Sequence, residues 1–158
     1  MPLIERFVAM LPEGPSVLEL GCRAGYESKR LAYVGAEVVG VDYSAQSIAV
    51  ARRRTPGCRF EVLDFRDMTT DLGLFDGVFA SASLIHISPD DLGGVFERVA
   101  GVLRPGGYLL VVVKEGKGIR ETWPVVNGER MRRVLYLYTP DVLDAASTDL
   151  AYQIDMIL

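Results

Sequence analysis

Three acidic residues each lie at or near the end of a short apolar run in the first 64 residues of the sequence. Glu19 belongs to the run that breaks into the glycine turn 21–25, Asp42 closes the second run, and Asp64 closes the third. A carboxylate can accept hydrogen bonds from both hydroxyls of a ribose at once. Glu19 also places a negative charge beside the turn, where a phosphate would require donors and no anion. The pattern therefore indicates a ligand that offers hydroxyl or cationic groups.

The spacing of these residues is typical of a nucleotide-type βαβ unit. A strand, a glycine turn and a helix follow one another, and in such units the ligand lies at the carboxyl end of the strand. Asp42 lies 17 residues beyond Gly25, about where an acid meets ribose hydroxyls in dinucleotide folds. Taken alone, Asp42 or Asp64 is also compatible with a helix N-cap or a solvated strand end. The three acids together with the glycine turn are more specific.

The elements that must position these acids alternate between apolar strands and helices. Helices are predicted at 2–11, 26–34, 44–54 and 89–103, and strands at 17–20, 37–42, 58–64, 75–80 and 108–114. Unbroken apolar strands that alternate with helices predict a parallel sheet covered on both faces. The expected fold class is α/β, a three-layer, Rossmann-like, doubly wound and mostly parallel sheet. Its first three strand ends should lie along one rim.

The second part of the chain gives a weaker pattern. Residues 115–133 contain glycines and a proline without a clear period, so an irregular segment is expected over 115–138, with a short strand at 134–138. A helix should follow from 139 to about 147, and a last strand at 151–158. We expect one domain over residues 1–158, in which the first 15 residues contribute only a short helix.

Composition and charge exclude several classes of function. The net charge of −4 and the pI of about 5.0 argue against a nucleic-acid partner. No apolar run approaches a bilayer span and the N-terminus lacks a signal pattern, so we expect no membrane association. The two cysteines, Cys22 and Cys58, do not suggest a disulfide framework and favour a cytoplasmic location. A single histidine, His86, offers no metal-ligand spacing, so no metal is expected.

Two other nucleotide-binding classes fail on their motifs. A nicotinamide dinucleotide site would need glycine at positions 21, 23 and 26, where this chain has Gly21, Arg23 and Tyr26. A phosphate-loop site would need a Gly-Lys-Ser/Thr sequence, which the chain lacks.

The motifs as a whole resemble those of the class I S-adenosylmethionine-dependent methyltransferases, over nearly the whole chain. The similar segments are the family's first motif at 17–25, its second at 39–44, the adenine-binding corner at 63–65, the fourth strand at 75–81 and the turn before the fifth strand at 103–107. The resemblance implies S-adenosyl-L-methionine as the cofactor. It also implies methyl transfer to an unidentified acceptor, which we expect to be a small molecule.

The resemblance assigns roles to the matching residues. Glu19 would face the amino group of the methionine moiety, Asp42 would hold the ribose, and Tyr43 would flank the adenine. Asp64 would meet the adenine amine. The other cofactor-binding positions would approach the cofactor closely, mainly through their backbone: Gly21, Cys22, Gly25, Phe65, Ala80 and Ser81.

The chain departs from the family pattern in two respects. Arg23 occupies a position where the family usually has glycine, which is tolerable if its φ is negative and its side chain points to solvent. The N-terminal segment is shorter than usual and the chain stops before a seventh strand, so the fold is expected to be minimal at both ends. A non-catalytic methyltransferase-like binding domain is therefore an alternative. An unpaired sheet edge would also invite a homodimer.

Methyl transfer from a sulfonium needs an aligned nucleophile, and a base where the acceptor must lose a proton. His86 is the candidate base because it follows the fourth strand, although it is also compatible with a packing or capping role. Six basic and three acidic residues lie between Lys114 and Arg133, a charge that favours an anionic or aromatic acceptor if it is more than a solvated face. The candidate acceptor-binding residues are Arg120, Trp123, Tyr136 and Tyr138.

Overall fold

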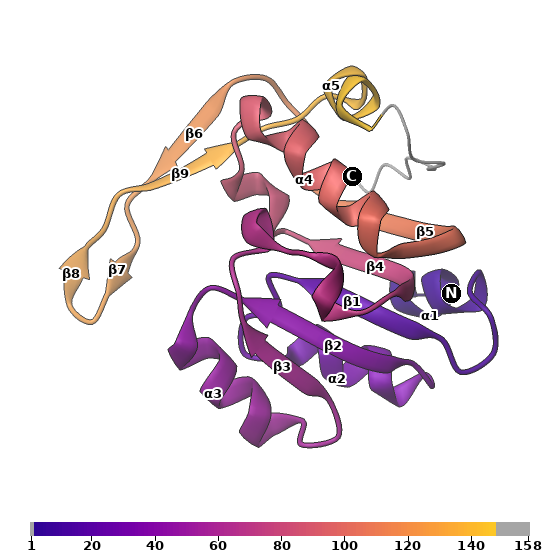
Figure 1. The fold of residues 1–158 in the computed structure, drawn as a ribbon. Helices are drawn as coiled ribbons and strands as arrows, with labels where there is room; N and C mark the ends of the chain where they lie inside the picture. Colours follow the sequence, from indigo (N-terminus) through magenta and orange to yellow (C-terminus); the bar gives the residue numbers. More distant parts are fainter. Residues whose placement is uncertain (1, 148–158) are drawn as a thin grey trace.

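The computed structural model describes residues 2–147, and a five-stranded parallel sheet lies at its centre (Figure 1). The strands lie in the order β3-β2-β1-β4-β5, and every neighbouring pair is parallel. Their bounds are β1 Ser16–Leu20, β2 Glu37–Asp42, β3 Arg59–Val62, β4 Phe75–Ser81 and β5 Leu103–Val112. The predicted doubly wound sheet is confirmed. The strand predicted at 151–158 lies outside the described residues.

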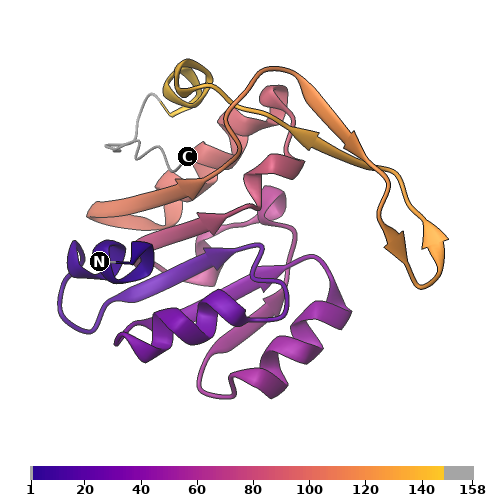
Figure 2. The same ribbon diagram turned by 180° about the vertical axis from the view of Figure 1, so that it is seen from behind.

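Helices cover both faces of the sheet, so the predicted three layers are present (Figure 2). One face carries α1 (Leu3–Ala9), α2 (Tyr26–Tyr33) and α3 (Ala45–Arg54), and the other carries α4 (Pro89–Val102). Short 3-10 turns η1 (Phe65–Asp67), η2 (Thr70–Leu72) and η3 (Leu84–His86) connect the strands, and α5 (Pro140–Ala146) packs beside α4. Within residues 2–147, no helix combines the length and the apolar character needed to cross a membrane.

The sheet is buried on both faces, as its apolar strands predict. Val17 and Leu18 point to opposite faces, and both are fully buried. The core has a larger cluster on the α4 face of the sheet and a smaller one on the α1 and α2 face, where Phe7 of α1 packs with Phe79 of β4, their ring centroids 5.8 Å apart. The larger cluster takes the residues of α4 that recur at helical spacing: Leu92, Val95, Phe96, Val99 and Val102.

The fifth strand starts earlier than the predicted strand at 108–114. β5 begins at Leu103, which pairs with Phe75, and the register then shifts so that Tyr108 pairs with Gly77. The turn residues 104–107 are therefore an irregularity within the strand and not a loop before it.

The irregular course predicted over 115–133 is wrong, because these residues belong to a hairpin arm (Figure 1), whereas the short strand predicted at 134–138 is confirmed. Strand β6 (Ile119–Thr122) pairs antiparallel with β9 (Arg133–Tyr136), and β7 (Val125–Val126) pairs with β8 (Glu129–Arg130). The tip is Asn127-Gly128, whose φ values of 52° and 83° suit a two-residue hairpin turn. We refer to residues 115–138 as the arm; it reaches away from the sheet in both views (Figure 2).

The base of the arm is fixed to the body next to η3. The hydroxyl of Tyr138 donates a hydrogen bond to the carbonyl of Ile87, and the Tyr138 side chain is 1% exposed. Strand β9 packs against η3, and His86 is hydrogen-bonded to the backbone of Val134. The arm therefore begins beside the segment that follows β4.

Candidate functional site

The three predicted acids lie along one rim of the sheet. Glu19 is next to last in β1, Asp42 is the last residue of β2, and Asp64 follows the end of β3 by two residues. Because β3, β2 and β1 are adjacent and parallel, these ends meet at the carboxyl edge of the sheet. β1 also pairs with β4, so this rim includes the crossover point at which open α/β sheets bind ligands.

Glu19 is a buried acid between β1 and α2. Its side chain is 3% exposed and accepts a hydrogen bond from the hydroxyl of Ser28 on α2. Burial raises the pKa of Glu19 to about 8, and the hydrogen bond from Ser28 only partly offsets that rise. The carboxyl group is therefore largely protonated at neutral pH, and a cation placed beside it would favour its ionised form.

Asp42 is held in one orientation by two backbone amides. Its Oδ2 accepts a hydrogen bond of 2.9 Å from the amide of Arg23, and its Oδ1 accepts one of 2.9 Å from the amide of Ser44. The residue is 6% exposed. Each oxygen keeps acceptor capacity for a ligand hydroxyl. Tyr43, the next residue, is 78% exposed at the same strand end.

Asp64 is already engaged within the chain. Its carboxylate accepts the amide of Arg66 at 2.9 Å and the guanidinium of Arg66 at 2.7 Å. These bonds lower the pKa of Asp64 and cap η1. The neighbouring Phe65 is 8% exposed and packs into the larger core. Any contact of Asp64 with a ligand amine must be shared with this ion pair.

The glycine turn brings backbone close to the end of β4. Gly21 has φ +68°, and a Cβ at that position would lie 2.6 Å from the Cβ of Ser83. Gly25 has φ +79° and precedes α2, where a Cβ would lie 3.0 Å from that of Ala51. Only glycine fits both positions. The Ser83 hydroxyl is buried and has no hydrogen-bond partner within the described chain.

Cys22 serves the turn through its backbone. Its amide donates to the carbonyl of Val41 at 2.9 Å, which joins the turn to β2. The side chain is 3% exposed and packs against Ile48 and Phe60. Burial raises the pKa of the Cys22 thiol far above its usual range, so this group is not an ionised nucleophile at neutral pH.

Arg23 meets only one of the two conditions under which the sequence allowed it, because its side chain is exposed but its φ is positive. Its φ is +50°, a left-handed conformation that is unusual for a residue with a side chain. Its guanidinium donates a hydrogen bond of 3.1 Å to the carbonyl of Ala82, just beyond β4, and does not simply point to solvent. In this conformation its amide donates the hydrogen bond to Asp42 described above. The sequence alone assigned no role to the Arg23 side chain, because the family usually has glycine, which has no side chain, at this position.

The end of β4 supplies the other predicted positions. Ala80 is fully buried in the larger core, so it can present only its backbone to a ligand, while Ser81 is half-buried. His86 follows in η3 and is exposed. Partial burial, Arg133 and Arg23 together lower the pKa of His86, which is therefore neutral at physiological pH.

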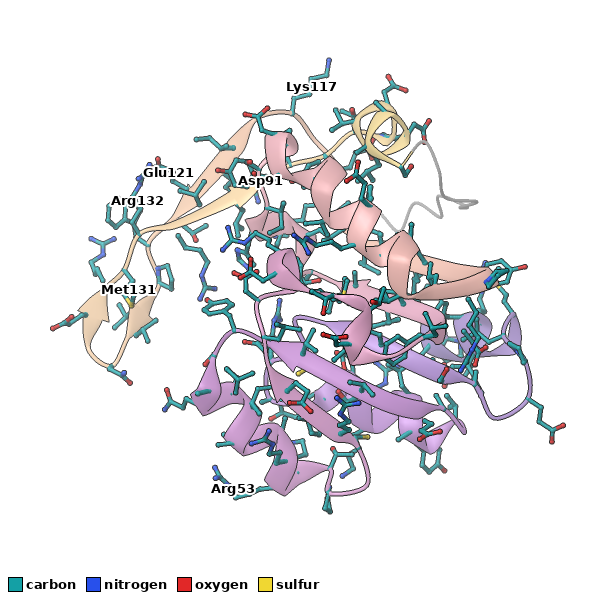
Figure 3. All side chains as sticks on the ribbon, in the orientation of Figure 1. Arg53, Asp91, Lys117, Glu121, Met131 and Arg132 are labelled. Carbon is teal, nitrogen blue, oxygen red and sulfur yellow. The ribbon has the colours of Figure 1, made fainter. Side chains whose placement is uncertain are left out.

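The predicted acceptor residues divide into two groups. Arg120 and Trp123 are exposed on the arm, and Tyr136 is half-buried on β9 near its base. Tyr138 does not fit the prediction, because its ring is buried and its hydroxyl is bonded to Ile87. In Figure 3, Glu121 and Met131 lie on the arm away from the sheet, and Arg132 pairs there with Glu121. No group of three or more metal-binding side chains occurs among residues 2–147.

Comparison with known proteins places this geometry in a family. A family model described as "Methyltransferase domain" matches residues 17–107. The chain is 33% identical over 121 residues to the putative methyltransferase YqeM of Bacillus subtilis, covering 73% of this chain and 49% of that protein. It is 30% identical to trans-aconitate 2-methyltransferase of Variovorax paradoxus, over 79% of this chain and 53% of that protein. The chain thus spans about half the length of these curated relatives.

Solved structures share the fold. A SAM-dependent methyltransferase from Methanosarcina mazei superposes with a TM-score of 0.78 at 23% identity, covering 94% of this chain and 83% of that one. The structure titled "DhpI-SAH complex structure" superposes with a TM-score of 0.71 at 28% identity, covering 84% of this chain and 65% of that one. The predicted sheet is therefore the one found in SAM-dependent methyltransferases.

Proposed function

This chain belongs to the methyltransferase domain family, and on that premise we propose that it transfers a methyl group from S-adenosyl-L-methionine to a small-molecule acceptor. The main observation behind the proposal is that two acids lie on either side of the glycine turn: Glu19, which is buried, and Asp42, which two backbone amides hold in place. Neighbouring solved structures include SAH and SAM complexes of a similar protein, which supports this cofactor.

The residues present fit the chemistry of this cofactor, which carries an ammonium, a sulfonium and ribose hydroxyls but no phosphate. Glu19 would bind the ammonium, and Asp42, already held by the amides of Arg23 and Ser44, would accept the ribose hydroxyls. Gly21 lies close to Ser83, and any residue with a side chain at position 21 would fill the space between them. Glycine therefore leaves its backbone exposed to a ligand there. The buried hydroxyl of Ser83, which has no hydrogen-bond partner within the described residues, lies beside this surface.

When bound, the cofactor supplies a methyl group on a positively charged sulfur, which leaves the protein to align the acceptor and to exclude water. We propose His86 as the base that takes a proton from the acceptor. Its lowered pKa keeps the imidazole neutral and able to accept a proton at physiological pH. Its contact with Val134 fixes the imidazole at the base of the arm.

We propose that the acceptor is a small anionic or aromatic molecule bound between η3 and the arm. Arg120 lies on β6 and Tyr136 on β9, the two paired strands nearest the base of the arm, and Trp123 directly follows β6. Relatives named trans-aconitate 2-methyltransferase and ubiquinone biosynthesis O-methyltransferase support the class of acceptor. The surplus of basic residues between Lys114 and Arg133 supports an anionic one.

We further propose that the arm binds a second copy of this chain. It exposes five large apolar side chains in one segment: Ile119, Trp123, Val125, Val126 and Met131. Residues 114–133 carry six basic and three acidic groups, which leaves 11 basic and 18 acidic groups in the rest of the chain. The arm and the body therefore carry opposite charge, which favours contact between the arm of one copy and the body of another.

The unpaired thiols of Cys22 and Cys58 suit a cytoplasmic location.

Calorimetric titration with S-adenosylmethionine and S-adenosylhomocysteine tests the proposal. Binding by the wild type that is lost in Asp42→Ala would support the cofactor site. A screen of small metabolites for formation of S-adenosylhomocysteine would then identify the acceptor. Absence of binding by the wild type would overturn the proposal. Binding without turnover across the screen would favour the non-catalytic alternative.

A further inference from the structure

Two residues with unexplained left-handed backbone conformations lie opposite each other at the candidate site. Among residues 2–147, three non-glycine residues have positive φ: Arg23 at 50°, Ala82 at 53° and Asn127 at 52°. Asn127 is accounted for by the hairpin turn of the arm. Arg23 and Ala82 follow adjacent strands, β1 and β4, and are joined by the 3.1 Å hydrogen bond from the Arg23 guanidinium. Strained residues that persist in a structure cluster at functional sites.

The guanidinium of Arg23 therefore spans the crossover point of the sheet. The turn that follows β1 lies on one side of it and the segment that follows β4 on the other, which is where ligands bind in this class of sheet. A guanidinium has five N–H donors, and Ala82 accepts from one nitrogen. None of the ion pairs among residues 2–147 involves Arg23. The side chain is exposed, so it is accessible to an anionic ligand.

The electrostatic surroundings place this cation within the site. Burial is the main cause of the raised pKa of Glu19, and the charge of Arg23 offsets a small part of that rise. Burial and Arg133 are the main causes of the lowered pKa of His86, and Arg23 adds to them, so Arg23 lies near both groups. A cation in a site for a positively charged sulfonium would repel the ligand unless an anion lay between them. The cofactor has one anionic group, the carboxylate of its amino-acid end. A guanidinium binds a carboxylate with two parallel hydrogen bonds.

We propose that Arg23 binds the α-carboxylate of the cofactor, while Glu19 binds the ammonium of the same amino-acid end. The inference rests on the proposed function, and it adds a residue at a position where the family usually has glycine. In this arrangement the guanidinium keeps or exchanges its hydrogen bond to Ala82 when the carboxylate arrives. The turn thus recognises both charges of the zwitterion, one from each end of the sequence Glu19–Arg23.

The alternative is that Arg23 only ties the turn to Ala82. The two roles differ in their response to Arg23→Gly, which restores the usual residue and removes the strained φ. If Arg23 only ties the turn, this variant changes the affinity for all ligands alike. If Arg23 binds the carboxylate, it changes the affinity only for ligands that carry one.

The test compares S-adenosylmethionine with decarboxylated S-adenosylmethionine, which differs only in the carboxylate. Dissociation constants are measured by calorimetry for the wild type, Arg23→Gly, Arg23→Lys and the control Arg30→Gln, an exposed arginine of α2 that pairs with Glu27. We expect the wild type to prefer the carboxylated ligand by about 10- to 100-fold, as for hydrogen bonds to charged groups. Arg23→Gly should lose most of that preference without weaker binding of the decarboxylated ligand, Arg23→Lys should keep part of it, and Arg30→Gln should keep all of it.

The same measurements distinguish a failure of the proposed Arg23 role from a failure of the proposed function. A wild type that binds S-adenosylmethionine but shows no preference, or an Arg23→Gly protein that keeps the preference, would overturn the role of Arg23 and leave the proposed function intact. A wild type that binds neither ligand while showing a cooperative thermal transition would overturn the proposed function itself.

Discussion

The hydroxyl of Ser28 donates a hydrogen bond to the carboxyl group of Glu19, and both side chains are buried beneath the glycine turn. Ser28 lies on the first helix after the turn and Glu19 on the strand before it, so the pair joins the two elements on either side of the candidate cofactor site. The bond fixes the carboxyl group, but burial still raises its pKa to about 8. The protonation state of Glu19 is therefore linked both to folding and to ligand binding.

Binding of S-adenosylhomocysteine at pH 7 should release close to one proton in the wild type. Glu19, with a pKa of about 8, is mostly protonated in the free protein and becomes ionised when the ligand ammonium binds beside it. Calorimetry in phosphate and in Tris buffer measures this release, because the observed enthalpy then depends on the buffer. Glu19→Gln should bind more weakly and show no such dependence. An enthalpy independent of buffer in the wild type would contradict this role for Glu19.

The same group should make folding stability depend on pH. The folded pKa of Glu19 is raised from 4.5, so its favourable contribution is complete below about pH 4.5 and is lost as pH rises to about 8. The free energy of unfolding of the wild type relative to Glu19→Gln should therefore fall by a few kcal/mol, in order of magnitude, over this range. Urea titrations at several pH values measure the difference. A constant difference would show that Glu19 ionises normally.

Asp42 and Asp64 should contribute unequally to cofactor affinity. Asp42 is buried and oriented by two backbone amides, whereas Asp64 is engaged by the guanidinium of Arg66. Asp42→Asn should weaken binding of S-adenosylhomocysteine by about 10-fold or more, since bonds to charged groups are worth about 1.5–3 kcal/mol. Asp64→Asn should weaken it by less than about five-fold, since exposed ion pairs contribute about 1 kcal/mol or less. Equal losses would contradict this ranking.

Gly21→Ala should destabilise the protein, because a Cβ at that position would lie 2.6 Å from the Cβ of Ser83 and the φ of +68° is unfavourable for alanine. The left-handed conformation alone costs about 1–2 kcal/mol. Gly93→Ala is the matched control, because Gly93 lies in α4 with no atom near its Cβ position, and it should stabilise the helix by about 0.5–1 kcal/mol. Urea denaturation measures both. Adding Ser83→Gly to Gly21→Ala should recover part of the loss; no recovery would contradict the contact.

His86→Ala should lower turnover by about 100-fold or more if the imidazole takes the acceptor proton. Affinity for S-adenosylmethionine should stay within about twofold, because His86 lies in η3 beside the arm and not on the strand ends that hold Glu19 and Asp42. The wild-type rate should fall as pH drops through the lowered pKa of His86, and this limb should disappear in the variant. Unchanged turnover on the true acceptor would remove His86 as the base.

The arm should control self-association. Val125→Glu combined with Met131→Glu replaces two exposed apolar side chains and reduces the positive charge of the arm. Sedimentation velocity should show the wild type as a dimer that weakens as salt is added, and the double variant as a monomer. Val62→Glu is the control, since Val62 is 50% exposed on the body of the protein. A monomeric wild type, or equal association in all three proteins, would contradict the proposed contact.

The sequence predicted much of the fold because its signals are local. Apolar runs that alternate with helical patterns, and Ser44 before α3, where its hydroxyl accepts the amide of Ser47 at 3.2 Å, are set within a few neighbouring residues. The hairpin arm was missed although Asn127-Gly128 between short apolar segments is a local hairpin signal. Exposed, polar strands such as β6 lack the apolar period on which the other predictions relied.

The sequence by itself determined the order of the five sheet strands and of the helices between them, the position of the glycine turn and the three acids at the strand ends. Only the tertiary structure decided how these groups are used. It pairs Asp64 with Arg66, buries Tyr138 against Ile87, and directs Arg23 across the crossover point to Ala82. Burial and pairing between residues distant in sequence depend on packing of the whole sheet. For that reason the raised pKa of Glu19 and the left-handed backbone of Arg23 are properties of the fold, although both residues belong to the first motif at 17–25.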